Sequence, residues 1–121
     1  MKAGARPWTV RLTAAAEADF GEILRWTVSQ FGERQARIYA ATISAALNDL
    51  AADPEIVGAK KRDDILKGLF TLHVARKRRK GRHFIMFRLQ HAADCDVIEV
   101  LRLLHDAMDL PRHLPLDDEA M

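Results

Sequence analysis

Residues 14–52 show helical periodicity that is interrupted at Gly32, and this pattern limits the possible folds more than any other feature. The first part, AAAEADFGEILRWTVSQF, is rich in helix formers, and Thr13 stands where an N-cap is expected. A second helical pattern runs from about Arg34 to Pro54, which disfavours helical geometry at the residue before it. Gly32 is a natural stop for the first helix. The pattern predicts two amphipathic helices that pack as an antiparallel hairpin.

Each predicted helix has one apolar stripe that needs a surface to cover. The first stripe consists of Ala16, Phe20, Ile23, Leu24, Thr27 and Phe31, and the second of Ala36, Tyr39, Ala40, Ile43, Ala46, Leu47 and Leu50. Trp26 projects roughly 120° away from the first stripe. An exposed tryptophan indicates a partner surface, with a local lid on the helix or a homodimer contact as the alternatives.

Short apolar runs outside the helices predict the sheet. They are WTVRLT (8–13), GLFTLHVAR (68–76), RHFIMFRL (82–89) and DVIEVLRLL (96–104). Lys80 and Gly81 predict a tight reversal in which the glycine takes positive φ. Successive strands with short connections favour an antiparallel meander. We therefore expect an α+β fold of order β-α-α-β-β-β, with a helix hairpin over one face of a small antiparallel sheet. The first strand is left open as an edge or an inner strand.

Length and composition favour a single domain. With 121 residues, about half of them apolar, we expect one domain over residues 1–121 with an ordered core at about 7–114. One cysteine, Cys95, excludes an internal disulfide framework and fits a reducing compartment. The N-terminus lacks the apolar core of a signal peptide, and no stretch approaches the roughly 20 apolar residues of a spanning helix. We expect a soluble cytoplasmic protein without membrane contact.

Charge is distributed unevenly along the chain. The net charge is +2, but residues 54–93 carry eleven basic and three acidic residues, and residues 94–121 carry two basic and eight acidic ones. Six of the seven residues at 76–82 are basic: Arg76, Lys77, Arg78, Arg79, Lys80 and Arg82. They are explained by a solvated turn, by contact with an acidic partner or target, or by nonspecific attraction to nucleic acid. Aromatic residues do not alternate with these charges, so base stacking is not indicated.

Three strings in this order resemble the ParE/RelE superfamily of bacterial toxins. They are VRLTAAAEADF at the start of the first helix, RHFIMFRL as a strand, and VIEVLRLLHDAMD at the end of the sheet. The last string is similar to the ParE pattern of an apolar strand, an arginine, two apolar residues, a histidine and an aspartate four residues on. In this chain the pattern falls on Arg102, Leu103, Leu104, His105 and Asp109. The resemblance covers roughly residues 7–114 and points to the ParE branch.

The resemblance implies the toxin of a type II toxin–antitoxin system, neutralised by a ParD-type antitoxin. Such antitoxins wrap a C-terminal segment around the toxin and carry the DNA-binding part, so DNA contact by this chain is expected to be indirect. ParE toxins are associated with poisoning DNA gyrase, whereas RelE toxins cleave messenger RNA on the ribosome. Because the two branches share a fold, only residues can choose between them.

RNA cleavage requires a general base, a general acid and positive charge at the phosphate. The candidates are His105 with Arg102, then His73 and His83 on neighbouring strands, with Arg76, Arg82 and Arg88 for the phosphate. The C-terminal His-Tyr pair of several nuclease relatives is absent, because Asp106 follows His105. Tyr39 is expected in the core. No complete acid–base set is apparent, and His105 is equally explained as a strand end that fixes the next turn.

Arg102 is expected either to pair with Asp109 or to face the target. The five histidines and Cys95 show no zinc-like spacing, and there is no glycine-rich phosphate loop. We therefore predict no metal and no cofactor. The expected function is inhibition of gyrase by binding, without chemistry performed by the toxin. Ribosome-dependent RNA cleavage is the alternative.

Overall fold

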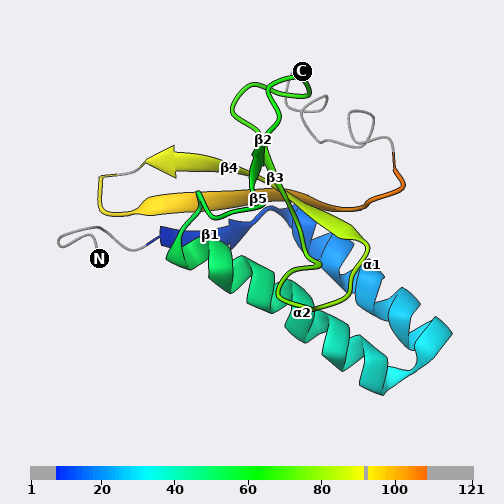
Figure 1. The fold of residues 1–121 in the computed structure, drawn as a ribbon. Helices are drawn as coiled ribbons and strands as arrows, with labels where there is room; N and C mark the ends of the chain where they lie inside the picture. Colours follow the sequence, from blue (N-terminus) through cyan, green and yellow to red (C-terminus); the bar gives the residue numbers. More distant parts are fainter. Residues whose placement is uncertain (1–7, 92, 109–121) are drawn as a thin grey trace.

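The computed structural model describes residues 8–91 and 93–108, and its elements follow the predicted order with one small addition. They are strand β1 (Trp8–Leu12), helices α1 (Ala14–Phe31) and α2 (Glu33–Ala52), and strands β2 (Lys60–Lys61), β3 (Phe70–His73), β4 (His83–His91) and β5 (Asp96–His105). Both helices lie on one face of the sheet (Figure 1). This is an α+β fold, as predicted. Residues 7, 92 and 109–114 of the expected core lie outside the described residues.

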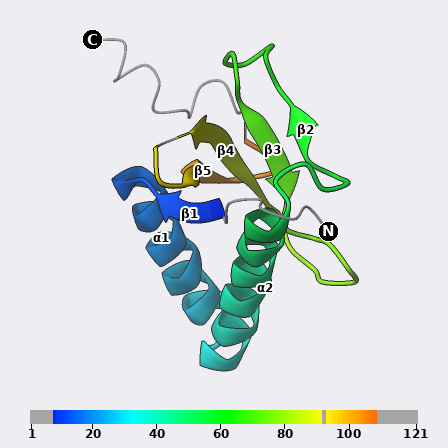
Figure 2. The same ribbon diagram turned by 90° about the vertical axis from the view of Figure 1, so that its left-hand side faces the viewer.

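The helix hairpin begins and turns at the residues that the sequence indicated. The hydroxyl of Thr13 accepts a hydrogen bond from the Ala16 N–H at 3.1 Å, and Gly32 separates the helices with a φ of 94°. Phe31 was placed in the apolar stripe, but it is 64% exposed. The turn of the hairpin lies away from the sheet (Figure 2), so the last residue of α1 has no strand beneath it. Among the described residues, neither helix is long and apolar enough to cross a membrane.

The sheet is mixed, which corrects the prediction of an antiparallel sheet. Its order is β1-β5-β4-β3-β2; β1 pairs with β5 in parallel, and the other pairs are antiparallel. β1 and β4 therefore lie on the two sides of β5, and β1 is an edge strand of the sheet. The alternation of Trp8, Val10 and Leu12 fixes which face of β1 meets the helices, but it contains nothing about strand direction.

An irregularity in the β4–β5 pairing lets one strand contribute to two cores. The register shifts between Met86 and Phe87, so the alternation of β5 changes phase around Leu101. Ile98, Val100 and Leu103 consequently pack beneath the helices with Ile43, Leu50 and Phe87. Leu101 and Leu104 pack on the opposite face with Leu69 and Met86, where Ile65 and Leu66 cover them.

The connection between β3 and β4 differs from the predicted tight reversal at Lys80 and Gly81. It is a loop over residues 74–82 with a turn in which the Arg79 N–H donates to the Arg76 carbonyl at 2.8 Å. Positive φ falls on Lys77 and Arg78. Gly81 is required for a different reason, because a Cβ there would lie 2.5 Å from Val74 Cγ2. We call residues 76–82 the basic loop.

Candidate functional site

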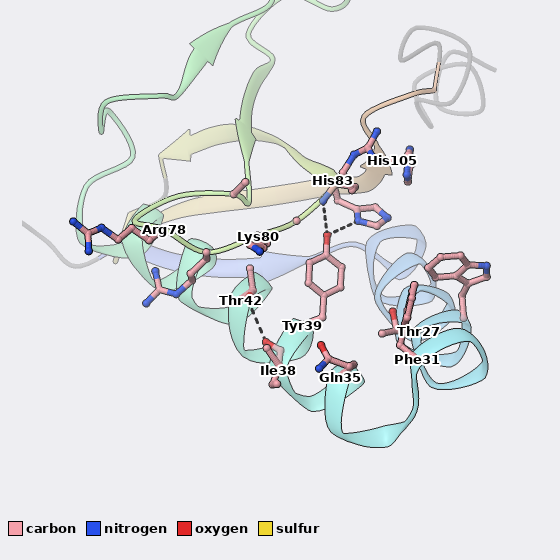
Figure 3. A pocket seen from close by; sticks show the side chains of 15 residues that line it. Thr27, Phe31, Gln35, Ile38, Tyr39, Thr42, Arg78, Lys80, His83 and His105 are labelled. Carbon is pink, nitrogen blue, oxygen red and sulfur yellow. Dashed lines mark hydrogen bonds between the residues drawn. The ribbon is translucent and has the colours of Figure 1, made fainter.

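An open groove of about 950 Å³ separates the basic loop from the outer end of the helix hairpin (Figure 3). Its helix side presents Trp26, Phe31 and Ile38, and its loop side presents Arg78, Arg79, Lys80 and Arg82. Tyr39, His83 and His105 close one end. The groove therefore has one apolar wall and one positively charged wall.

The apolar wall consists of large side chains that water reaches. Trp26 is 59% exposed, as the sequence predicted, and its ring packs edge-on against Phe31 with a centroid distance of 5.8 Å. Ile38 on α2 is also exposed. Exposed apolar side chains that share one patch, beside a polar rim, are typical of a binding surface.

The structure divides the six predicted cations of the basic loop into two groups. Arg76 and Lys77 turn toward α2 and pair with Asp49 at 3.5 Å and 3.2 Å, and Arg76 also donates to the Val57 carbonyl at 2.7 Å. These contacts fix the loop to the helix. The other four, Arg78, Arg79, Lys80 and Arg82, line the groove. Only the second group is positioned to meet a partner in the groove.

Tyr39 connects α2 to the first residues of β4. Its hydroxyl accepts a hydrogen bond from the Arg82 N–H at 2.9 Å and lies 2.7 Å from His83 Nδ1 (Figure 3). Burial, with the nearby His105 as a smaller cause, lowers the pKa of His83 to about 4, so this ring is neutral at neutral pH. Tyr39 was expected in the core. Its ring does pack against the core, while the residue also lines the end of the groove.

Asp106 follows β5 and binds one group from β3 and one from the basic loop. One carboxylate oxygen lies 2.9 Å from His73 Nε2, and both oxygens accept from Arg82 Nε at 3.1 and 3.2 Å. The hydrogen bonds from Arg82 and His73 lower the pKa of Asp106 to about 2. In the structure its charge is balanced by neighbouring residues.

Backbone amides fix the proton positions on two of these histidines. His105 Nδ1 accepts from the Ala107 N–H at 3.0 Å, and His73 Nδ1 accepts from the Ala75 N–H at 3.1 Å. Because an amide can only donate, each neutral ring carries its proton on Nε2. The His105 contact matches the prediction that its ring fixes the turn after the strand.

The sequence identified His83 and His105 as separate candidates, but their proximity in the fold was not predicted. His83 begins β4 and His105 ends β5, and the antiparallel register places them opposite each other with ring centroids 5.3 Å apart. The signal was available, since a histidine at the start of one strand faces a histidine at the end of its antiparallel neighbour. The remaining candidates lie elsewhere. Arg88, for example, pairs with Glu99 at 2.8 Å.

Arg102 forms a structural ion pair. Its Nε and Nη2 atoms bind both oxygens of Asp19 on α1 at 2.7 and 2.8 Å, and Asp19 also accepts the Leu103 N–H at 2.9 Å. The predicted partner, Asp109, lies outside the described residues. Arg102 therefore joins β5 to the first helix, and it does not line the groove. Within residues 8–91 and 93–108, no cluster of three potential ligands could hold a metal ion.

Comparison with known proteins gives consistent matches over most of the chain. A family model described as "ParE toxin of type II toxin-antitoxin system, parDE" matches residues 10–110. Toxin ParE1 of Mycobacterium tuberculosis is 32% identical over 103 residues, which cover 85% of this chain and 94% of that protein.

Solved structures show the same fold. One from the "Chromosomal ParDE TA system from P. aeruginosa" aligns with a TM-score of 0.65 at 19% identity, covering 81% of this chain and 95% of that one. A chain of the toxin-antitoxin complex RelBE2 from Mycobacterium tuberculosis aligns with a TM-score of 0.51 at 26% identity, covering 82% and 98%. The shared fold accounts for the helix hairpin and the sheet, but it does not assign a role to the groove residues of this chain.

Proposed function

Because the chain belongs to the ParE toxin family of type II toxin–antitoxin systems, we propose that its antitoxin is of the ParD type and that it inhibits DNA gyrase by binding. The observation that carries this proposal is the groove, which has an apolar wall beside a basic wall. Such a surface suits a protein partner and needs no chemistry from the toxin itself. We place this action in the cytoplasm, where gyrase and DNA meet.

The antitoxin part of the proposal rests on complementarity. Arg78, Arg79, Lys80 and Arg82 stand close together and repel one another, so an acidic segment in the groove relieves that repulsion. Trp26, Phe31 and Ile38 offer apolar area to the same segment. An antitoxin tail with apolar residues on one side and carboxylates on the other fits both walls. DNA contact is then made by the antitoxin.

RNA cleavage remains the second candidate because one observation favours it. Tyr39, His83 and His105 meet beside Arg82, and the RelBE2 neighbour shares the fold. A general base, however, needs a free lone pair next to the 2′-hydroxyl. The Nδ1 lone pair of His105 accepts from a backbone amide, and its Nε2 carries the proton. The same holds for His73, which favours inhibition by binding.

Two assays run side by side test the toxic activity. Purified gyrase is given plasmid DNA and this protein, and supercoiling and trapped cleaved DNA are measured. Programmed ribosomes are given the same protein, and messenger RNA length is followed. Lost supercoiling with intact RNA supports the proposal. Cut RNA with unaffected gyrase overturns it, and His105→Ala then distinguishes a catalytic histidine from a structural one.

Antitoxin binding is tested with matched charge reversals. The Arg78→Glu, Arg79→Glu double variant should weaken binding of a ParD-type antitoxin from the same genome by at least tenfold. The control is Lys60→Glu, Lys61→Glu, which reverses two exposed charges on β2, outside the groove. Equal effects of the two pairs would mean that only net charge matters and that the groove is not the binding site.

A further inference from the structure

The histidine end of the groove, formed by Tyr39, Arg82, His83 and His105, offers hydrogen-bond donors to whatever lies in the groove. His105 donates because its Nδ1 is occupied by the Ala107 N–H, which leaves the proton on Nε2. Its side chain is 38% exposed and lines the groove. Among the described residues, no hydrogen-bond acceptor engages the His105 Nε2–H.

His83 has the same orientation of its proton. The Tyr39 hydroxyl already accepts the Arg82 N–H at 2.9 Å, and accepting that bond makes the hydroxyl a stronger donor toward Nδ1, 2.7 Å away. The proton of the neutral His83 ring is then on Nε2. The two adjacent imidazoles therefore both carry their proton on Nε2.

The carboxylate beside these rings does not satisfy them. Asp106 is engaged by His73 and by Arg82, and its Oδ1 atom lies 3.6 Å from Nδ1 of His105, the nitrogen that carries no proton. Arg82 contacts Asp106 through Nε and one terminal nitrogen. The other N–H groups of its guanidinium remain available to a ligand in the groove. This end of the groove consequently has more hydrogen-bond donors than acceptors.

We propose that the histidine end is a carboxylate-binding subsite, which receives an aspartate or glutamate side chain of a polypeptide lying in the groove. The His105 Nε2–H and the Arg82 guanidinium donate to the carboxylate oxygens. A polypeptide is favoured over RNA because Phe31 and Ile38, in the same groove, match apolar side chains of the same segment. This proposal rests on the proposed binding of an antitoxin in the groove. It specifies where in the groove an acidic side chain of the antitoxin is bound.

The first test needs no partner. Long-range ¹H–¹⁵N spectra of the full chain should show His105 as the Nε2–H tautomer, and sodium acetate should shift its Nε2 resonance. His91 is the control, because it is exposed at the other end of β4 and pairs with Asp96. An Nδ1–H tautomer, or equal acetate shifts at His91 and His105, overturns the subsite. A response to inorganic phosphate but not to acetate overturns it in favour of a nucleic-acid phosphate.

The second test uses the bound antitoxin and separates this inference from the proposed function. His105→Leu should weaken the antitoxin about tenfold, whereas His105→Gln, which keeps a donor near the Nε2 position, should stay within about twofold of the unsubstituted protein. His91→Leu should have no effect. Tight antitoxin binding that is equal in all four proteins overturns the subsite and leaves the groove proposal intact. Absence of antitoxin binding refutes the groove proposal, and the acetate result then decides the subsite alone.

Discussion

The ion pair between Asp19 and Arg102 provides a direct test of whether a ParE-pattern residue is structural. The Asp19→Ala change removes both oxygens that bind the Arg102 guanidinium and also leaves the Leu103 N–H without its acceptor. Both side chains are largely buried, with 12% of Asp19 and 24% of Arg102 exposed. Loss of one partner from a buried pair costs about 3–5 kcal/mol, and the partial exposure of Arg102 reduces this to about 2–3 kcal/mol.

Urea unfolding measures this loss. With a slope of about 2 kcal/mol per molar, the midpoint should fall by about 1–1.5 M, and the melting temperature should fall by roughly 10 °C. Arg102→Ala should lose a similar amount, and the double variant should lose much less than the sum, with a coupling of at least about 1.5 kcal/mol.

The matched control is the exposed pair of Glu33 and Arg37 on α2, whose 3.9 Å contact should contribute less than about 0.5 kcal/mol. A loss below about 1 kcal/mol for Asp19→Ala would refute the reasoning. It would mean that the Arg102 guanidinium is satisfied without the Asp19 carboxylate, and Arg102 would become a candidate for target contact again.

Three further predictions concern the groove and the loop beside it. Gly81→Ala should destabilise the protein by about 2 kcal/mol or more, because the new methyl group would overlap Val74; urea unfolding measures this. Asp49→Ala should release the basic loop, which trypsin should then cleave at least several-fold faster. His83 lowers stability in acid, because the unfolded chain takes up its proton near pH 6.5 and the folded chain near pH 4. The free energy of unfolding should therefore fall as pH falls from 6.5 to 4, and His83→Gln should flatten this slope.

Each of these outcomes has a control. Gly21→Ala introduces a methyl group that meets only the flexible end of Arg25, so it should not destabilise α1. Trypsin cleavage of the Asp49→Ala variant at an unchanged rate would show that the loop is held by other contacts. An identical pH slope in the His83→Gln variant would assign the acid sensitivity to other groups, among which Asp106 acts only below about pH 4.

The sequence predicted the local features well, because each depends on residues close together in the chain. Thr13 caps a helix through its hydroxyl and Gly32 ends one through its N–H, each with a partner within four residues. Trp26 was predicted to be exposed from helical spacing alone. The direction of β1 could not be predicted, since a five-residue alternation is the same for a parallel and an antiparallel partner.

The groove could be predicted only in part, because it is built from elements far apart in the chain. The charge of the basic loop was visible, but its division into a group held by Asp49 and a group facing the groove depends on where α2 packs. The meeting of Tyr39, His83 and His105 depends on the register of β4 with β5 and on the helix laid across them. Gly81 was assigned a turn conformation, and packing against Val74 is what requires it.

The parallel pairing of β1 with β5 has a consequence for how the toxin acquires its activity during synthesis. The Thr13 hydroxyl donates to the Leu101 carbonyl, 88 residues later, so β1 has no edge to join until β5 has left the ribosome. His105, which completes the groove, lies at the end of the same last strand. A nascent chain that lacks β5 therefore has neither the complete five-stranded sheet nor the complete groove. Nascent chains stalled before β5 should therefore be cleaved rapidly by protease, because the sheet and the groove are completed at the same step of synthesis.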